Sequence, residues 1–390
     1  MPHILIAPNA FKNSLDAASA AAAIRQGLLN SKLDCTCECF PIGDGGDGTG
    51  ELIMKKYNGI NFPEKVLDPL GRIITASYGL INDDNDCIIE MADASGIRLL
   101  KTSELDPLHA TSFGTGQLIE AALDQGIHKI IIGMGGSATV DGGCGILQAL
   151  GIRFLDAGKN ELTRLPESLV DLAIVDLSLL DQRILNCEVT VLCDVDNGLL
   201  GENGSAAVFG PQKGASPEAV EKLEAALTNF TNITLKQTGI NMAAIPCGGT
   251  AGGAAAGLHS FINAELVNGI DYFLELTGFD IALQKADILV TGEGSIDEQT
   301  LQGKGPFGVA YRAKQLGIPV IGLAGKVPLV KSPDLGNYFD LLLSIGNEPA
   351  DLKTALAATS DNLTRVAGEI GNLLSIINPG KCRVPKSGEQ

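Results

Sequence analysis

The sequence contains no tryptophan, only four histidines, and 28 basic side chains against 46 acidic ones, so its formal net charge is −18. A nucleic-acid-binding protein needs a basic face that displaces the counterions of the phosphate backbone. The shortage of positive charge therefore argues against a nucleic acid as a partner. It does not exclude a small anionic substrate, because a local basic pocket can lie within an acidic surface.

The sequence also lacks closely spaced pairs of metal ligands. Its nine cysteines include no C-x-x-C motif, and none of its four histidines lies close to another. An odd number of cysteines in 390 residues does not define a disulfide framework. Cys35, Cys37 and Cys39 alternate along one expected strand, so they share a face but lie too far apart to bridge in a straight strand. The cysteines argue against a structural zinc site and predict a reduced, cytoplasmic protein.

Long apolar runs are absent, because no segment reaches the ~18 residues of a membrane span. The N-terminus lacks the basic region and the long apolar core of a signal peptide. We therefore expect a soluble protein without a membrane partner. Glycine, in contrast, is abundant: it accounts for 48 of the 390 residues, about 12% against an average of ~7%. Glycine marks places where the backbone turns tightly or approaches a ligand.

The order of short apolar runs and amphipathic segments predicts an α/β protein with a largely parallel, buried sheet. The length corresponds to two or three domains of ~100–200 residues. Expected helices include one that begins after a cap at Ser14 or Asp16 and ends near Leu29. Two more cover residues 49–57 and 217–237. The expected strands cover residues 3–7, 35–42, 72–80, 87–91, 129–133, 188–193, 287–291, 319–323 and 340–344.

Polar, glycine-rich loops follow these strands, and ligands of open α/β sheets bind at the carboxyl ends of strands. The loop at residues 43–48 matches G-x-G-x-x-G, the dinucleotide fingerprint, in its usual context between a strand and a helix. Asp44 and Asp47 would repel a pyrophosphate unless a cation lay between them, so we reject that interpretation. The loop is better suited to Mg²⁺ or to a substrate hydroxyl. The alternative is a turn with a capping aspartate.

Two other loops suit a phosphate group. Residues 135–143 offer successive backbone N–H groups, two hydroxyls and a helix N-terminus, and residues 248–253 repeat this chemistry. Neither is a Walker A loop, because the chain has no G-x-x-x-x-G-K-[ST]. Each could instead be a plain glycine-rich turn between a strand and a helix. No G-x-S-x-G elbow is present, which argues against a serine hydrolase.

Acidic residues follow two further strands. Asp194 and Asp196 lie two positions apart, and Glu293 and Asp297 form a second acidic loop. Carboxylate oxygens in such positions can hold Mg²⁺ or accept a hydroxyl proton. Capping or simple solvent exposure is the alternative for each of them.

Isolated lysines lie in the same kind of loop, at positions 12, 213 and 304. In a chain with few bases this placement favours anion binding, with ordinary surface charge as the alternative. Phosphoryl transfer needs a cation and N–H groups to stabilise the developing negative charge, and a carboxylate to position the acceptor hydroxyl. The combination of acidic metal candidates, glycine-rich phosphate loops and lysines therefore indicates phosphoryl transfer.

Seven colinear motifs resemble the bacterial glycerate kinase family (type I), and the resemblance extends from residue 3 to about residue 372. Asn9, Ala10 and Val140 depart from the family pattern, which argues against a catalytic role at positions 9 and 10. The motifs cover residues 7–15, 41–49, 111–118, 135–143, 193–197, 208–215 and 292–304.

This resemblance implies phosphorylation of D-glycerate by ATP, with Mg²⁺, to 2-phosphoglycerate. It implies two α/β domains: a discontinuous, Rossmann-like one with a mostly parallel sheet, residues 1–66 and 284–390, and an inserted one, residues 67–283. The active-site cleft would lie between them. The strands near Ile4, Cys37, Leu289, Ile321 and Leu342 would share one sheet. Whether the protein is a homo-oligomer stays open, as does a variant that forms 3-phosphoglycerate.

The resemblance to the glycerate kinase family implies an expected role for each candidate residue. The catalytic residues would be Asp194, Lys12 and Lys213. The nucleotide phosphates would bind Gly135, Gly136, Ser137, Thr139, Gly252, Gly253 and Lys304. The substrate would bind Ser14, Asp44, Ser95, Thr115 and Asp297, and the metal would bind Asp47, Asp196 and Glu293. The rival interpretations are a sensor that binds a small molecule or a metal, and a kinase for another hydroxy acid or small polyol.

Overall fold

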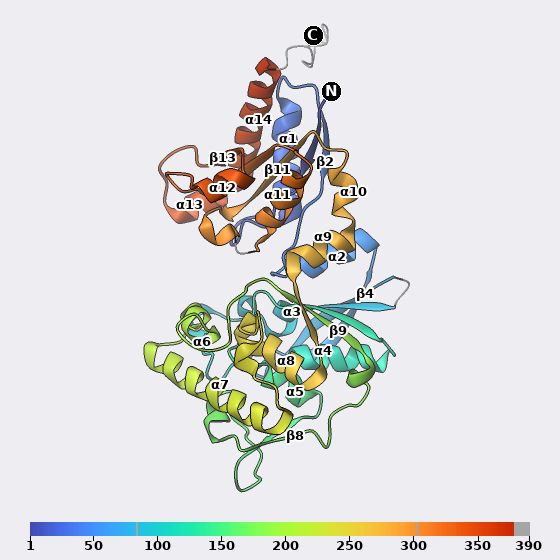
Figure 1. The fold of residues 1–390 in the computed structure, drawn as a ribbon, viewed down its shortest axis with the longest axis vertical. Coiled ribbons are helices and arrows are strands. Elements are labelled where there is room, and N and C mark those ends of the chain that lie inside the picture. Colours follow the sequence, from blue (N-terminus) through green and yellow to red (C-terminus); the bar gives the residue numbers. More distant parts are fainter. Residues whose placement is uncertain (83–84, 302, 378–390) are drawn as a thin grey trace. The chain divides into compact units, whose positions relative to one another are not determined.

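The computed structural model describes residues 1–82, 85–301 and 303–377. The chain divides into two compact units (Figure 1). One unit combines Met1–Asp44 with Phe273–Gln390, and the other is Gly45–Tyr272. The domain boundaries expected from the sequence, after residues 66 and 283, stay a prediction.

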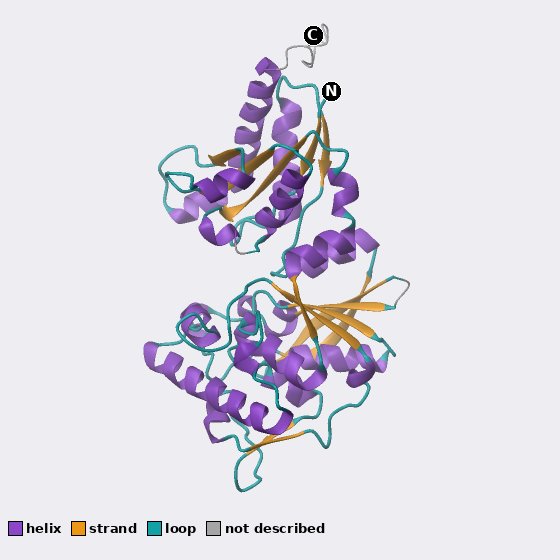
Figure 2. Ribbon diagram, viewed as in Figure 1, coloured by secondary structure: helices purple, strands orange, loops and turns teal. Residues whose placement is uncertain are grey.

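The first unit contains a five-stranded, fully parallel sheet with helices against it (Figure 2). The strand order is β13-β12-β11-β1-β2. These strands carry the five apolar segments that were expected to share one sheet, so that prediction is confirmed. Their bounds are β1 His3–Ile6, β2 Thr36–Cys39, β11 Ile288–Ser295, β12 Val320–Lys326 and β13 Leu341–Ser344.

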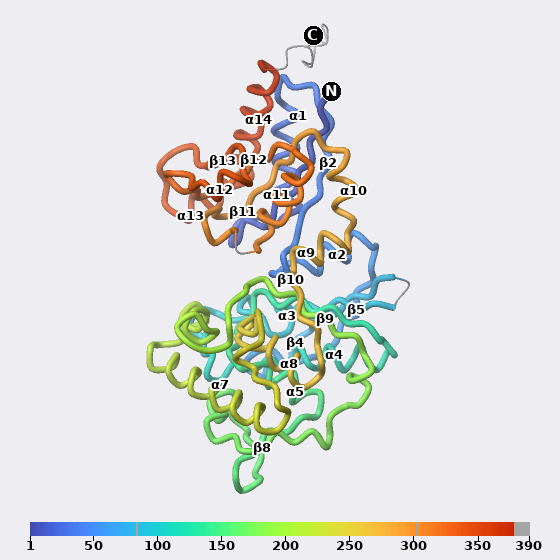
Figure 3. Tube along the Cα trace, in the orientation of Figure 1, coloured from blue at the N-terminus to red at the C-terminus, as the bar shows by residue number. Residues whose placement is uncertain are grey.

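Helices α1 (Ala17–Asn30) and α14 (Thr359–Ile377) pack side by side in this unit (Figure 3). Asp16, rather than Ser14, caps α1 by accepting a hydrogen bond from the Ser19 N–H. The close approach depends on Gly27, where an added Cβ would lie 2.1 Å from the Thr364 carbonyl oxygen. Apolar residues of both helices and of the sheet form one buried core. The remaining helices are α10 Phe279–Leu283, α11 Gly305–Gln315, α12 Pro333–Tyr338 and α13 Leu352–Ala357.

The second unit contains a six-stranded sheet in the order β10-β9-β6-β5-β4-β3. Strands β5, β6, β9 and β10 run parallel, while β3 and β4 add an antiparallel edge. Strand β3 was not predicted, because it contains Pro63 and is largely exposed, and proline in a sheet is confined to edges and bulges. The bounds are β3 Ile60–Leu67, β4 Ile73–Ile81, β5 Asp86–Glu90, β6 Lys129–Gly133, β9 Glu188–Cys193 and β10 Glu265–Asn268.

One large apolar core joins this sheet to its helices. A short hairpin of β7 (Arg153–Leu155) and β8 (Ile174–Asp176) lies apart from the main sheet. The helices that lie wholly in this unit are α2 Thr49–Tyr57, α3 Met91–Ser95, α4 Phe113–Asp124, α5 Cys144–Ala149, α6 Ser205–Phe209, α7 Pro217–Thr238 and α8 Ala254–Ile262. Helix α9, Gly269–Thr277, contains the boundary between the two units. In the part of the chain that the structure describes, no helix combines the length and the apolar character that crossing a membrane requires.

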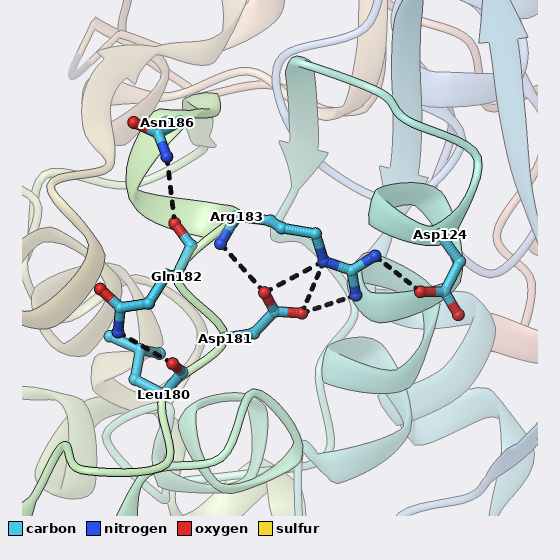
Figure 4. A network of polar contacts seen from close by, with 6 residues as sticks. All are labelled: Asp124, Leu180, Asp181, Gln182, Arg183 and Asn186. Carbon is cyan, nitrogen blue, oxygen red and sulfur yellow. Dashed lines mark hydrogen bonds and ion pairs between the residues drawn. The ribbon is translucent and has the colours of Figure 1, made fainter.

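The chain enters β9 through a segment that Arg183 ties to α4 (Figure 4). Its guanidinium donates to Asp124 at 2.8 Å and to Asp181 at 2.6 Å. The side chain of Gln182 donates to the Leu180 carbonyl at 2.9 Å. Exposed ion pairs contribute only ~0–1 kcal/mol each, so burial of the Leu180 and Ile184 side chains holds this segment more firmly than the arginine does.

Candidate active site

Polar loops follow the carboxyl ends of the parallel strands in the second unit, as expected for an open α/β sheet. Strand β5 ends at Glu90 and continues into α3, and β6 ends at Gly133 and continues into residues 135–143. Strand β9 ends at Cys193, directly before Asp194. Strand pairing therefore places three of the expected functional segments at one edge of the sheet.

Lys213 lies in the interior of this unit with only 4% of its surface exposed. It ends a 3₁₀ turn, Pro211–Lys213, that Gly214 terminates in the left-handed conformation. Its ammonium group donates to the Ser137 hydroxyl at 2.8 Å and to the Thr139 carbonyl at 2.7 Å. Burial lowers the pKa of Lys213 to about 8, although the nearby charges of Asp141 and Asp194 favour the protonated form. Three residues with expected catalytic or phosphate-binding roles, Lys213, Ser137 and Thr139, are thus in direct contact.

The hydroxyl of Thr139 is fully buried and has no hydrogen-bond partner among the residues that the structure describes. Leaving such a group without a partner costs about 1–3 kcal/mol. A polar atom in this situation, next to a buried ammonium group, is suited to a hydrogen bond with a bound molecule. The Thr139 side chain therefore supports an anion site beside Lys213.

Asp141 anchors the loop of residues 135–143 rather than facing a ligand. Its buried carboxylate accepts hydrogen bonds from the Ser112 N–H and hydroxyl and from the N–H groups of Gly143 and Gly145. These bonds tie the loop to the N-terminal ends of α4 and α5. The charge of Asp141 also favours the protonated form of Lys213.

The two glycine-rich loops pack against each other. An added Cβ at Gly252 would lie 2.1 Å from the Thr139 carbonyl oxygen, and the Gly142 N–H donates to the Gly252 carbonyl at 2.9 Å. Gly252 and Gly253 have φ values of 70° and 90°, a region that favours glycine. The close approach explains why position 252 needs glycine, and it places both expected phosphate loops at one location.

Ser95 and Thr115 form a buried pair whose hydroxyl oxygens lie 2.7 Å apart. The Ser95 carbonyl also accepts a hydrogen bond from the Ala138 N–H at 2.9 Å. The structure thus brings these two expected substrate residues next to the loop of residues 135–143. Because each hydroxyl already has the other as a partner, their visible contribution is to hold that loop.

Glu90 was missed by the sequence reasoning, although an acidic residue that ends an apolar strand is a usable signal. Its carboxylate accepts hydrogen bonds from the N–H groups of Gly48 and Gly50 at the N-terminus of α2. Burial raises the pKa of Glu90 to about 7, and Asp93 and Asp47 add to the shift. Glu90 thus holds the loop that carries Asp47.

Asp47 itself is paired with Arg98. The guanidinium lies 3.1 Å from one Asp47 oxygen and also contacts Asp93, and all three side chains are partly exposed. Asp196, the other metal candidate of this unit, is exposed. Neither position forms a metal cage by itself.

The stability of the protein should show the titration of Glu90. A carboxyl whose folded pKa is raised from 4.5 to about 7 stabilises the fold fully below pH ~4.5, and this contribution is lost as the pH rises through about 7. Glu90→Gln removes the titration. We therefore expect the free energy of unfolding of the natural protein, relative to the variant, to fall by ~3 kcal/mol between pH 4.5 and pH 8.

Urea unfolding of both proteins across this pH range measures the difference. Glu120→Gln, at a fully exposed position of α4, is the matched control and should follow the natural protein at every pH. A difference between the natural protein and Glu90→Gln that does not change with pH would contradict a raised pKa at Glu90.

A second polar cluster lies in the first unit. Glu293, near the end of β11, is 8% exposed and accepts a hydrogen bond from the Thr300 hydroxyl at 2.9 Å. Burial raises the pKa of Glu293 to about 7, which the charges of Lys304 and Lys12 oppose and that of Asp44 supports. Four candidate residues of the sequence analysis are therefore electrostatic neighbours, although they come from three separate segments of the chain: Lys12, Asp44, Glu293 and Lys304.

Other residues of this unit have local partners. Asp44 accepts a hydrogen bond from the Asn9 side chain at 2.7 Å. Asp297 accepts one from the Gln299 N–H at 3.0 Å, which caps the following turn. The Ser14 hydroxyl donates to the Leu356 carbonyl of α13 at 2.6 Å. The structure thus shows a structural contact within the unit for Ser14 and for Asp297, and their expected role in substrate binding stays a prediction.

No group of three or more histidine, cysteine, aspartate or glutamate side chains in the described ranges is arranged to hold a metal ion. Glu293 and Asp44 offer carboxylate oxygens in the first unit, and burial, with a smaller contribution from the charge of Asp44, raises the pKa of Glu293.

Comparison with known proteins agrees with the motifs. A model of the glycerate kinase family matches residues 4–375. A glycerate kinase from Halalkalibacterium halodurans is 43% identical over 84% of this chain and 86% of its own length. The glycerate 2-kinase of Escherichia coli is 40% identical over 96% of this chain and 98% of its own length. A crystal structure described as a candidate glycerate kinase 2 from Salmonella typhimurium LT2 has a TM-score of 0.80 at 40% identity, and covers 97% of this chain and 99% of that chain. The resemblance seen in the sequence is confirmed: the chain belongs to the glycerate kinase family and is a kinase.

Proposed function

We propose that this protein transfers the γ-phosphoryl group of ATP to D-glycerate and releases 2-phosphoglycerate and ADP. The observation that carries the proposal is the buried ammonium group of Lys213, in contact with the Ser137 hydroxyl and with the carbonyl of Thr139, whose own hydroxyl has no partner among the described residues. Phosphoryl transfer needs fixed positive charge and hydrogen-bond donors where negative charge develops, and a dry environment strengthens both. Family membership and the names of the relatives support the same reaction.

The acceptor hydroxyl needs a base and an anchor. Asp194, half-buried and one residue past the end of β9, is our candidate for the group that accepts the hydroxyl proton. Lys12 and Lys304 supply positive charge in the first unit for a carboxylate or a phosphate. Mg²⁺, when bound, would neutralise part of the phosphate charge, with Glu293 as the favoured carboxylate and Asp47 and Asp196 as further candidates.

The 2-hydroxyl is the expected acceptor. A lysine that holds the substrate carboxylate fixes the C2 hydroxyl, one carbon away, more firmly than the C3 hydroxyl, and in-line transfer requires a fixed acceptor. The name of the Escherichia coli relative, glycerate 2-kinase, supports this choice. The same geometry predicts that one product isomer dominates.

Enolase added to the reaction products tests the activity and the isomer together. We expect ADP to form faster with D-glycerate than with L-glycerate or without an acid, and phosphoenolpyruvate to appear with enolase alone. A rate of ADP formation that does not increase with D-glycerate would favour the sensor interpretation. Phosphoenolpyruvate that appears only after addition of a phosphoglycerate mutase would show transfer to the 3-hydroxyl. A faster reaction with another hydroxy acid or a polyol would show that D-glycerate is not the preferred substrate.

A further inference from the structure

The second unit has a cavity that the site described above does not use. Its volume is about 510 Å³, and it is lined by residues of the segment 241–247 and by His259, Glu265 and Leu266. All of these residues belong to the second unit. The volume lies within the range of ~300–1,000 Å³ that is usual for small-molecule sites. We refer to this space as the 241–266 cavity.

The 241–266 cavity adjoins the glycine-rich loop of residues 248–253, which was expected to bind nucleotide phosphates. The segment 241–247 leads directly into this loop through successive turns. The Gly248 N–H donates to the Ile245 carbonyl at 3.1 Å, and the Thr250 N–H donates to the Cys247 carbonyl at 3.0 Å. A ligand whose anionic end binds the loop can therefore place its other end in the cavity.

Aliphatic side chains form much of the wall of the cavity. Sites for small organic ligands usually combine such walls with a few polar groups that fix the orientation of the ligand. The faces of a purine base are apolar, so they gain from leaving water for a surface of this kind. The aliphatic residues that line the cavity are Ala244, Ile245, Pro246 and Leu266.

The polar side chains of the cavity offer both donors and an acceptor. The Asn241 Oδ1 accepts a hydrogen bond from the Ala243 N–H at 3.2 Å, and the Asn241 amide nitrogen carries two N–H donors. The His259 Nδ1 lies 2.9 Å from the Ala264 carbonyl oxygen. Because a carbonyl oxygen only accepts, Nδ1 carries the ring proton, and Nε2 is an acceptor when the ring is neutral. Adenine presents an amino donor next to ring-nitrogen acceptors, so this set is complementary to its edge.

We propose that the 241–266 cavity binds the adenine base of the phosphoryl donor, while the adjoining loop of residues 248–253 binds its phosphates. The identity of the donor as ATP rests on the proposed function. The location of the base rests on the cavity, on its continuity with the loop and on the donors and acceptor that line it.

A second cavity of this unit, of about 630 Å³, suits a nucleotide less well. It is lined by Glu202, Glu221 and Glu224, and by no lysine or arginine from the described part of the chain. Three carboxylates repel the phosphates of a nucleotide. Among the described residues that line the 241–266 cavity, Glu265 is the one carboxylate, and it is exposed, so water and salt screen its charge.

Photolabelling of the full chain with 8-azido-ADP tests the location of the base. The sequence has no lysine or arginine between Lys236 and Lys285, so one tryptic peptide, residues 237–285, contains every residue that lines the cavity. We expect the label in this peptide, at positions 241–247 or 259–266 in tandem mass spectra, and we expect unlabelled ADP to suppress it. A label that ADP suppresses but that lies only in other peptides would overturn the proposal.

Two neighbouring alanines provide a matched pair of variants. Ala243 and Ala244 are both exposed in the same 3₁₀ turn, Met242–Ala244, but only Ala244 lines the cavity. Ala244→Trp should fill the cavity and raise the Kd for ADP, measured by calorimetry, about tenfold or more, because the base loses its apolar contacts and hydrogen bonds. Ala243→Trp should change this Kd less than twofold. The Kd for tripolyphosphate, which has no base, should change less than twofold in both variants.

The possible failures can be told apart. Unchanged ADP affinity in a folded Ala244→Trp protein, or an equal loss of affinity for ADP and for tripolyphosphate, would overturn the base site. If Ala244→Trp does not fold, the photolabel on the natural protein decides. A natural protein that is labelled in the cavity but shows no D-glycerate-dependent ADP formation would contradict the proposed function and leave the base site standing. An active kinase that is labelled elsewhere would do the reverse.

Discussion

Asp194→Asn should lower kcat by ~10²-fold or more while the protein stays folded, the scale of loss expected for a positioned general base. The asparagine side chain has the same size as aspartate but cannot accept the proton of the acceptor hydroxyl. Asp194 follows the buried strand β9, and its charge also favours the protonated form of Lys213. KM for D-glycerate should change less than kcat, because the base acts in the transition state.

Steady-state rates with saturating MgATP give this result, and thermal unfolding shows whether the fold is intact. Asp171→Asn is the matched control, since Asp171 is exposed at the end of a 3₁₀ turn in the same unit. Near-normal turnover in a folded Asp194→Asn protein would place the base elsewhere, and Asp44 and Asp297 would be the next positions to substitute.

Lys213→Met should lower kcat by ~10²–10³-fold, the range found when one preorganised donor to developing negative charge is removed. Methionine keeps the length of the side chain and fills the buried space, but it donates nothing to Ser137 or to the Thr139 carbonyl. The lost hydrogen bonds should also destabilise the fold by about 1–3 kcal/mol. A loss of stability alone would not explain a lower kcat in the fraction that remains folded.

The pH profile separates the catalytic role of Lys213 from a structural one. Its pKa in the free enzyme is lowered from 10.5 to about 8, so the positive charge is present below pH 8 and is lost as the pH rises through that value. We therefore expect kcat/KM of the natural protein to fall above pH ~8 and the residual activity of Lys213→Met to lack this step. Lys222→Met, at an exposed position of α7, is the control and should keep it. A variant with the same alkaline step as the natural protein would assign that step to another group.

The sequence alone determined most of the strands, because buried parallel strands appear as continuous apolar runs. Residues 129–133 and 188–193 were predicted with the observed bounds of β6 and β9. The antiparallel edge strand β3 was not found, since it is largely exposed and contains a proline. The order of motifs along the chain was also sufficient for the family, because seven motifs in one order are far more specific than any one of them.

Only the tertiary structure decided what each polar residue contacts. Gly252 meets Thr139 and Lys213 meets Ser137 because strand order and helix packing bring these segments together, and spacing along the chain does not encode those contacts. Asp141 and Glu90 show the same limit. In the sequence, a carboxylate that accepts hydrogen bonds from backbone N–H groups cannot be told from one that faces a ligand. Burial and hydrogen-bond partners distinguish the two, and only the folded chain provides them.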